Sequence, residues 1–174
     1  MARRVVITGT GVIHALGKDI ETFWNAIKEG KNGITKVTKF DCSNLETKVA
    51  SEITDFDPTL YMDKKEAKRM DLFTQYAMAA ASMAIEESGL DISKEDPFRI
   101  GVLIGSGIGG IQTLEDQKVV LMEKGPSRVS PFFVPMMISN MASGQVAIKF
   151  GFQGFNECVT TACATANNAI GDAF

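Results

Sequence analysis

The sequence predicts an α/β layered fold, because patterns typical of buried strands alternate along the chain with patterns typical of amphipathic helices. Two strand candidates, residues 3–11 (RRVVITGTG) and 99–110 (RIGVLIGSGIGG), run directly into glycine-rich turns, as the opening of an α/β unit does. A shorter candidate at residues 157–161 (ECVTT) precedes the last helical pattern. No repeat, low-complexity tract or linker interrupts the alternation, and 174 residues is the length of one ordinary domain.

The first helix is predicted to begin after Asp19, a residue type that favours the N-cap, and to end before Gly30. The apolar residues that follow the cap have the spacing of one helix face: Ile20, Phe23, Trp24 and Ile27. A weaker strand pattern, residues 48–54 (KVASEIT), comes next in the chain.

A long helix is predicted from Lys64 to Glu87, and its alanine-rich face implies close packing against another helix or a sheet. Further helices are expected over residues 111–124 and 141–150. Between them, residues 130–140 are apolar but contain two prolines, which prevents this segment from forming one regular helix.

The composition is that of a globular protein, with 45% hydrophobic and 22% charged residues. A net charge of −3 predicts no general affinity for nucleic acid or for a membrane surface. No apolar run approaches membrane-spanning length, and the start MARRVVITG lacks the features of a signal peptide. We therefore expect a cytoplasmic protein.

The cysteines are sparse and odd in number: Cys42, Cys158 and Cys163. This set predicts no disulfide framework, and no CxxC spacing indicates zinc, so no metal is expected. The only histidine is His14, although most nucleophilic cysteine chemistry needs a histidine nearby.

Three glycines, Gly105, Gly107 and Gly110, fit the G-x-G-x-x-G signature of dinucleotide-binding proteins. The signature normally lies in the first strand–helix unit, with an acidic residue at the end of the second strand. Here it lies deep in the chain and is followed by a helical pattern, so we favour the interpretation that these glycines permit tight turns and close backbone approach. A nucleotide-binding oxidoreductase remains the less favoured alternative.

Cys163 is the strongest candidate for a reactive residue, because it lies between a strand pattern and a helix pattern with small residues on both sides. Strand, turn and helix in this order resemble a nucleophile elbow. The free N–H groups and the dipole of a helix N-terminus favour an anion and could hold a developing oxyanion. The alternative is that Cys163 is a small buried apolar residue, which is the usual fate of a free cysteine.

The stretch TACATANNAIGDAF, residues 161–174, resembles the active-site segment of the β-ketoacyl-acyl-carrier-protein synthases, the condensing enzymes of fatty-acid synthesis. Three further segments resemble the type II synthases in the same order and spacing: RRVVITGTGVI (3–13), GSGIGG (105–110) and RVSPFFVPMMISNMASGQVAI (128–148). The resemblance covers essentially the whole chain, and the retained cysteine is typical of a catalytic subunit.

The resemblance implies that Cys163 carries an acyl chain as a thioester, with its own backbone N–H in the oxyanion hole. A malonyl-carrier would then lose carbon dioxide, and the resulting carbanion would attack the acyl group in a Claisen-type condensation. Ile108 matches a residue that lines and gates the acyl pocket, although ordinary core packing explains it as well from the sequence alone. Phe133 and its apolar neighbours match a segment near the dimer interface, where the partner subunit helps to close the acyl pocket.

The implied partners are an acidic acyl-carrier protein and, in the full-length protein, a second subunit of a homodimer. The resemblance assigns carrier docking to a basic group on the predicted long helix and to one arginine beyond it: Lys64, Lys65, Lys68, Arg69 and Arg128. A solvated helix face is the alternative. No cofactor of the enzyme is implied, because phosphopantetheine arrives on the carrier protein.

The family has a thiolase-like αβαβα fold, built from two halves that each contain a five-stranded mixed sheet. The resemblance implies that residues 1–174 are the N-terminal portion of this fold, cut within the active-site helix and therefore incomplete. Two catalytic histidines of the family come from a later segment, and His14 lies in a turn where it cannot replace them. We expect the chain by itself to be inactive, and a non-catalytic carrier-binding or dimerising piece is the alternative.

Overall fold

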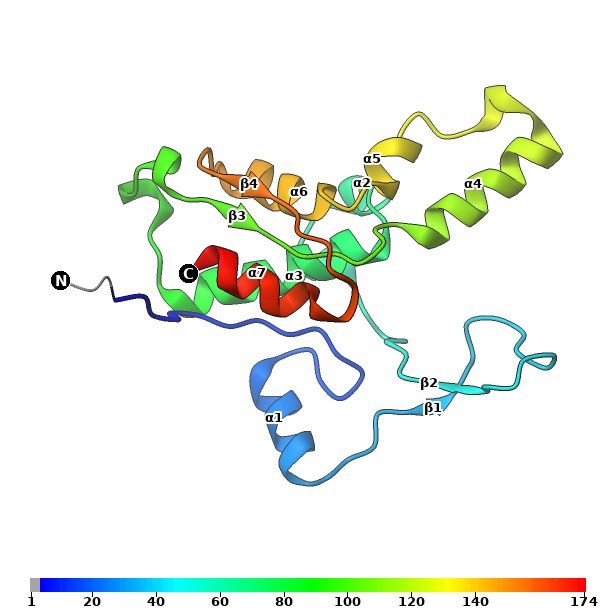
Figure 1. Ribbon diagram of the computed structural model, residues 1–174, viewed down its shortest axis with the longest axis horizontal. Coiled ribbons are helices and arrows are strands. Elements are labelled where there is room, and N and C mark those ends of the chain that lie inside the picture. The colour runs from blue at the N-terminus through cyan, green and yellow to red at the C-terminus, as the bar shows by residue number, and fades with distance from the viewer. Residues whose placement is uncertain (1–3) are drawn as a thin grey trace.

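The computed structural model describes residues 4–174, which contain seven α-helices and two short strand pairs (Figure 1). The α-helices are α1 (Ile20–Lys28), α2 (Lys64–Ala67), α3 (Leu72–Ser88), α4 (Ile111–Lys124), α5 (Phe133–Met137), α6 (Met141–Phe150) and α7 (Thr165–Ala173). The strands are β1 (Thr35–Lys36), β2 (Val49–Ala50), β3 (Val102–Leu103) and β4 (Asn156–Glu157). None of the helices described in residues 4–174 has the length and apolar character needed to cross a membrane.

The core lies where α3 packs against α6, with β3 alongside them (Figure 1). Met78 of α3 and Val146 of α6 are buried there, together with Val102 of β3. Tight packing is possible because the contact surfaces carry small residues: Ala79, Ala142 and Ser143 are fully covered. The close packing that the alanine-rich sequence predicts is therefore confirmed.

A second alanine surface of α3 packs against the N-terminal segment. A Cβ atom at Gly9 would lie 2.0 Å from the carbonyl oxygen of Ala84, and one at Gly11 would lie 2.0 Å from that of Ala80. Only residues without a side chain can approach a helix backbone this closely. The first glycine-rich turn thus serves helix packing.

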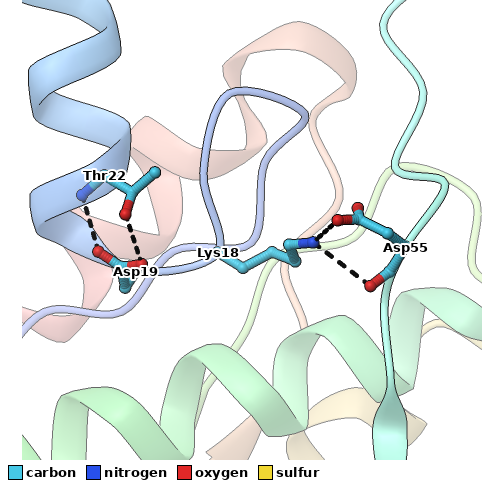
Figure 2. A network of polar contacts seen from close by, with 4 residues as sticks. All are labelled: Lys18, Asp19, Thr22 and Asp55. Atoms are coloured by element: carbon cyan, nitrogen blue, oxygen red, sulfur yellow. Dashed lines mark hydrogen bonds and ion pairs between the residues drawn. The ribbon is translucent and has the colours of Figure 1, made fainter.

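The predicted bounds of α1 are confirmed. The Asp19 carboxylate accepts hydrogen bonds from the Thr22 N–H (2.7 Å) and hydroxyl (2.8 Å), as Figure 2 shows. These bonds hold the pKa of Asp19 below its ordinary value, and Gly30 lies beyond the helix end in the left-handed region (φ +67°). Lys18 forms an ion pair with Asp55 (Figure 2), which ties the turn before α1 to the segment after β2.

The strand predicted at residues 3–11 is wrong for the part that the structure describes. Residues 4–11 belong to no strand pair, and the side chains of Val5, Val6 and Ile7 are 45%, 58% and 85% exposed. A strand needs a neighbouring edge for its N–H and C=O groups, and residues 4–174 supply none at this position. Of the strand pattern at 48–54, only β2 forms, antiparallel to β1.

The single helix predicted from Lys64 to Glu87 is also wrong, because the chain breaks it into α2 and α3. Between them Met70 turns into the core, where it is 7% exposed. Asp71 then caps α3 by accepting from the Phe73 N–H (3.3 Å), and the Gln75 side chain bridges the break to the Ala67 and Met70 carbonyls (3.0 and 2.9 Å).

The predicted helices over residues 111–124 and 141–150 are confirmed, whereas of the strand predicted at residues 157–161 only Glu157 lies in a strand, β4. β3 leads into the glycine loop and then α4, the two prolines limit α5 to five residues, and α6 ends at Gly151 in the left-handed region. β3 pairs in parallel with β4, joining Val102 with Asn156. Within residues 4–174 there are only two two-stranded ladders, fewer than the incomplete five-stranded mixed sheet that the resemblance implies.

Candidate active site

Cys163 lies in a turn between an extended segment and a helix, as its sequence context predicts. The backbone after β4 runs extended to Thr160, a short 3₁₀ turn η5 (Ala162–Ala164) follows, and α7 begins at Thr165. Within residues 4–174 the thiol is free and exposed. Cys158 is half-buried and Cys42 is buried, so Cys163 is the most accessible of the three.

The turn is held in an unusual backbone conformation. Ala162 has a φ of +49°, the left-handed region, which costs a residue other than glycine about 1–2 kcal/mol. Two side-chain contacts stabilise it: the Thr161 N–H donates to the Thr165 hydroxyl (2.8 Å), and the Thr161 hydroxyl contacts Asn168 (3.1 Å). Sequence reasoning missed Thr165, a buried residue whose only signal is its place two residues after the cysteine.

The glycine loop at residues 105–110 begins directly beside this turn. A Cβ atom at Gly105 would lie 2.4 Å from the Thr165 methyl carbon, so only glycine fits there. The parallel pairing continues past β4, because the Ser106 N–H donates to the Val159 carbonyl (3.2 Å) and the Thr160 hydroxyl donates to the Ser106 carbonyl (2.8 Å). The segment before Cys163 and the start of the loop are thus joined.

The far end of the loop is joined to α5. The Gly110 N–H donates to the Met137 carbonyl (2.8 Å), and Gly109 has a φ of +81° and donates its N–H to the Ser106 hydroxyl (3.1 Å). Between the two attachments, Ile108 is 70% exposed, and a Cβ atom placed at Gly107 would meet no other atom within 4 Å. Ile108 therefore lies on a short arch and is not part of the packed core.

Asp71 lies at the start of α4, where a dinucleotide-binding loop would hold phosphate. Its carboxylate accepts from the Thr113 hydroxyl (2.6 Å) and N–H (3.2 Å), although the two residues are 42 positions apart. An anion already fixed at this helix N-terminus repels a pyrophosphate group. The geometry speaks against the nucleotide-binding alternative.

Phe133 lies in an apolar groove between α4 and the segment that returns along it. The groove has a volume of about 250 Å³ and is lined by Leu114, Gln117, Lys118, Leu121, Val129 and Phe133. Phe133 is the first residue of α5, whose last residue, Met137, holds the glycine loop. The structure therefore connects the Ile108 and Phe133 elements through the backbone of α5.

The predicted docking residues divide into two places. Lys64, Lys65 and Lys68 are exposed on and just after α2, while the Arg69 guanidinium lies over the Phe132 ring, 4.6 Å from its centroid. None of the ion pairs found in residues 4–174 involves any of these four cations. Arg128 ends the 3₁₀ turn after α4, a helix of 14 residues that spans ~21 Å, so it lies at the opposite end of this helix from Asp71.

His14 has a local role in the turn before α1. Its Nδ1 atom accepts from the Leu16 N–H (3.1 Å), its backbone pairs with that of Gly17, and its ring contacts the Phe23 ring edge-on. In the described part of the chain, no three His, Cys, Asp or Glu side chains gather to hold a metal ion.

Solved ketosynthase structures resemble this chain in fold and indicate the class of protein. A chain in the complex of a type II PKS acyl-carrier protein with its ketosynthase superposes with a TM-score of 0.82 and 26% identity, covering 97% of this chain and 44% of that one. The ishigamide ketosynthase/chain length factor gives a TM-score of 0.82, 26% identity and coverages of 98% and 45%. A beta-ketoacyl synthase from Burkholderia phymatum gives 0.81 at 23% identity, with coverages of 99% and 43%. The fold is the N-terminal part of the thiolase-like ketosynthase fold, as the resemblance implies.

The family follows from the sequence comparison. The model of the beta-ketoacyl synthase N-terminal domain matches residues 2–174, and the chain belongs to this family. It is 51% identical over 172 residues to 3-oxoacyl-[acyl-carrier-protein] synthase 2 of Synechocystis sp. The matched region covers 99% of this chain and 41% of that protein. The same-named protein of Staphylococcus aureus is also 51% identical, with coverages of 99% and 42%. The chain thus spans about two fifths of the length of these relatives.

Proposed function

We propose that the protein containing this chain is a 3-oxoacyl-[acyl-carrier-protein] synthase that elongates fatty-acyl chains. One observation carries the proposal: the exposed thiol of Cys163 follows a strand and precedes a helix, with the Ile108 loop fastened to the same turn. The relatives at 51% identity carry the name of this activity.

In the acyl-transfer step, the Cys163 sulfur attacks the thioester carbonyl of an acyl-carrier. The new C–S bond forms as the bond to the phosphopantetheine sulfur breaks, and the proton of Cys163 leaves with the carrier thiol. The backbone N–H of Cys163, in the 3₁₀ turn η5 that leads into α7, stabilises the oxyanion of the tetrahedral intermediate. No cofactor of the enzyme is required, because the carrier delivers phosphopantetheine.

In the condensation step, a malonyl-carrier loses carbon dioxide, and the carbanion formed attacks the acyl carbon on Cys163. The C–S bond breaks, the thiolate of Cys163 is regenerated, and the β-ketoacyl product remains on the carrier. The family histidines that promote this decarboxylation come from a part of the fold that residues 1–174 do not span. We therefore assign acyl transfer to this chain, and condensation to the complete protein only.

We assign carrier docking to Lys64, Lys65 and Lys68 on α2, with Arg69 beside them and Arg128 as a separate contact. Exposed cations without ion-pair partners on a net-acidic protein steer an acidic partner and raise its rate of association. A related ketosynthase has been solved in complex with its acyl-carrier protein, which supports this assignment. We further propose that the acyl chain lies between the Ile108 loop and the groove at Phe133.

The decisive experiment incubates the full-length protein with an acyl-carrier and maps the adduct by peptide mass spectrometry. We expect the acyl group on Cys163, complete loss of the adduct in Cys163→Ala, and an unchanged adduct in the matched control Cys158→Ala. An adduct on Cys42 or Cys158, or condensation by Cys163→Ala, would overturn the proposal. Carrier binding without any adduct would instead support the non-catalytic alternative.

A further inference from the structure

We propose that Asp71 is a positioning residue: by holding Thr113 at the start of α4, it fixes the Ile108 arch and thereby sets the discrimination between long and short acyl chains. This inference rests on the proposed function, because it gives the arch a part in acyl selection. Asp71 itself lies in the break between α2 and α3, outside every motif that the sequence suggested.

One carboxylate stabilises the ends of two helices. Asp71 Oδ1 accepts from the Phe73 N–H in the first turn of α3, while Oδ2 accepts from both the hydroxyl and the N–H of Thr113 in the first turn of α4. Thr113 is 6% exposed, so water cannot readily replace the carboxylate as its partner. The position of α4 relative to α3 depends on this contact.

The same carboxylate lies directly against the end of the glycine loop. A Cβ atom at Gly110 would be 2.9 Å from Asp71 Oδ2 and 2.3 Å from the Met136 carbonyl oxygen. Gly110 is thus confined between Asp71 of one element and α5 of another, and its N–H is bonded to the Met137 carbonyl. Asp71 therefore packs directly against the last residue of the loop.

The position of Ile108 depends on the two points at which the backbone of the glycine loop is attached. The loop is fixed at Ser106 through the strand that leads to Cys163 and at Gly110 through Asp71 and α5. Ile108 is 70% exposed between these two points, so no packing within residues 4–174 holds its side chain in place. The direction in which Ile108 points is then set by where the two attachments hold the backbone.

The charge of Asp71 also affects the pKa of Tyr76, which lies further along α3. Burial raises the pKa of Tyr76, and the negative charge of Asp71 adds to this effect. Asp71 itself is half-buried, and hydrogen bonds to a charged acceptor are stronger where water is partly excluded.

The test compares matched variants of the full-length protein. Thr113→Val removes the hydroxyl donor at nearly constant volume, Thr113→Ser keeps it, and Asp71→Asn removes the charge. The matched control is Asp19→Asn, which alters a similar carboxylate–threonine pair at the start of α1 (Figure 2). The readouts are the ratio of kcat/KM for long over short acyl-carriers and the hydrogen–deuterium exchange of residues 105–110.

We expect Thr113→Val and Asp71→Asn to change the selectivity ratio about tenfold, the factor that corresponds to one lost hydrogen bond. Exchange of the loop amides should become faster in both, whereas Thr113→Ser and Asp19→Asn should match the unmodified protein. If Asp71→Asn does not fold, the Thr113→Val and Thr113→Ser pair decides the question.

Unchanged loop exchange in Thr113→Val, or an unchanged ratio in an active Thr113→Val protein, would overturn the inference. An equal effect of Asp19→Asn would do the same, because it would show a general loss of stability. Absence of an acyl adduct on Cys163 in the unmodified protein would overturn the proposed function instead, and the exchange measurement would still judge the role of Asp71.

Discussion

Cys163 follows Ala162, whose positive φ turns the backbone sharply enough to expose the thiol at the surface. The residues around it are small because other backbone segments approach closely, as Gly105 does at Thr165. Sequence reasoning located Cys163 and the glycine loop from local pattern alone. It missed Asp71 and Thr113, because a contact between residues 42 positions apart leaves no local pattern.

Substitution of Gly110 tests the close packing of the glycine loop against α5. Gly110→Ala should lower the free energy of unfolding by about 1–3 kcal/mol, because its Cβ atom would overlap the backbone carbonyl of Met136. Gly107→Ala is the matched control and should change it by less than ~0.5 kcal/mol, since the space there is open. Urea unfolding of the full-length variants measures both, and equal effects would contradict the packing argument.

At the scale of elements, the break between α2 and α3 is the main departure from the sequence prediction. Residues 64–87 have good helix-forming composition, but burial of Met70 and capping by Asp71 outweigh continuation of the helix. The break also lets Arg69 reach Phe132, next to the groove residue Phe133. Local propensity could not predict the break, because the core residues around Met70 and the ring of Phe132 lie in other elements.

The contact between Arg69 and Phe132 should be measurable as a coupling between α2 and the segment before α5. A double-mutant cycle of Arg69→Gln and Phe132→Leu should give a coupling energy of about 0.5–1 kcal/mol, the size of an exposed cation–π contact. Substituting Lys68→Gln in the same cycle should give none. Denaturant unfolding of the four full-length proteins provides the values, and zero coupling for Arg69 would refute the contact.

Substitutions of the docking residues should change the rate at which the carrier protein associates. Lys68→Glu should weaken carrier binding mainly by lowering the association rate, and the effect should shrink as salt is added. Arg69→Lys should leave the association rate nearly unchanged, because it keeps the charge and loses only the planar group over Phe132. Stopped-flow association at two ionic strengths tests this, and a salt-independent loss in Lys68→Glu would argue against electrostatic docking.

At the scale of the molecule, α4 and the returning segment project away from the α3–α6 core (Figure 1). Their exposed apolar residues include Leu114, Val119, Leu121, Met122 and Val134. Exposed apolar side chains gathered on one projecting element are typical of an interface with another chain. We therefore propose that the full-length protein forms a homodimer, and that it does so through this projecting element, with Phe133 close to the contact.

Dimerisation should depend on these side chains in the full-length protein. The double variant Val119→Lys and Met122→Glu should raise the dimer dissociation constant by about 30-fold or more, the effect of losing a well-packed interface contact. Ile148→Glu on α6, which alters an equally exposed apolar residue, should leave it unchanged. Sedimentation velocity measures both, and a dimer unaffected by the double variant would place the interface elsewhere.

Features whose causes lie within a few residues follow from the sequence alone: the caps of α1, the helical extent of α4 and α6, and the strand–turn–helix order at Cys163. Features that depend on distant partners follow only from the folded chain. Residues 4–8 form no strand because an extended segment acquires its ladder of hydrogen bonds only from a neighbouring strand. Likewise, Asp71 can hold the Ile108 arch only because folding brings α3 and α4 together.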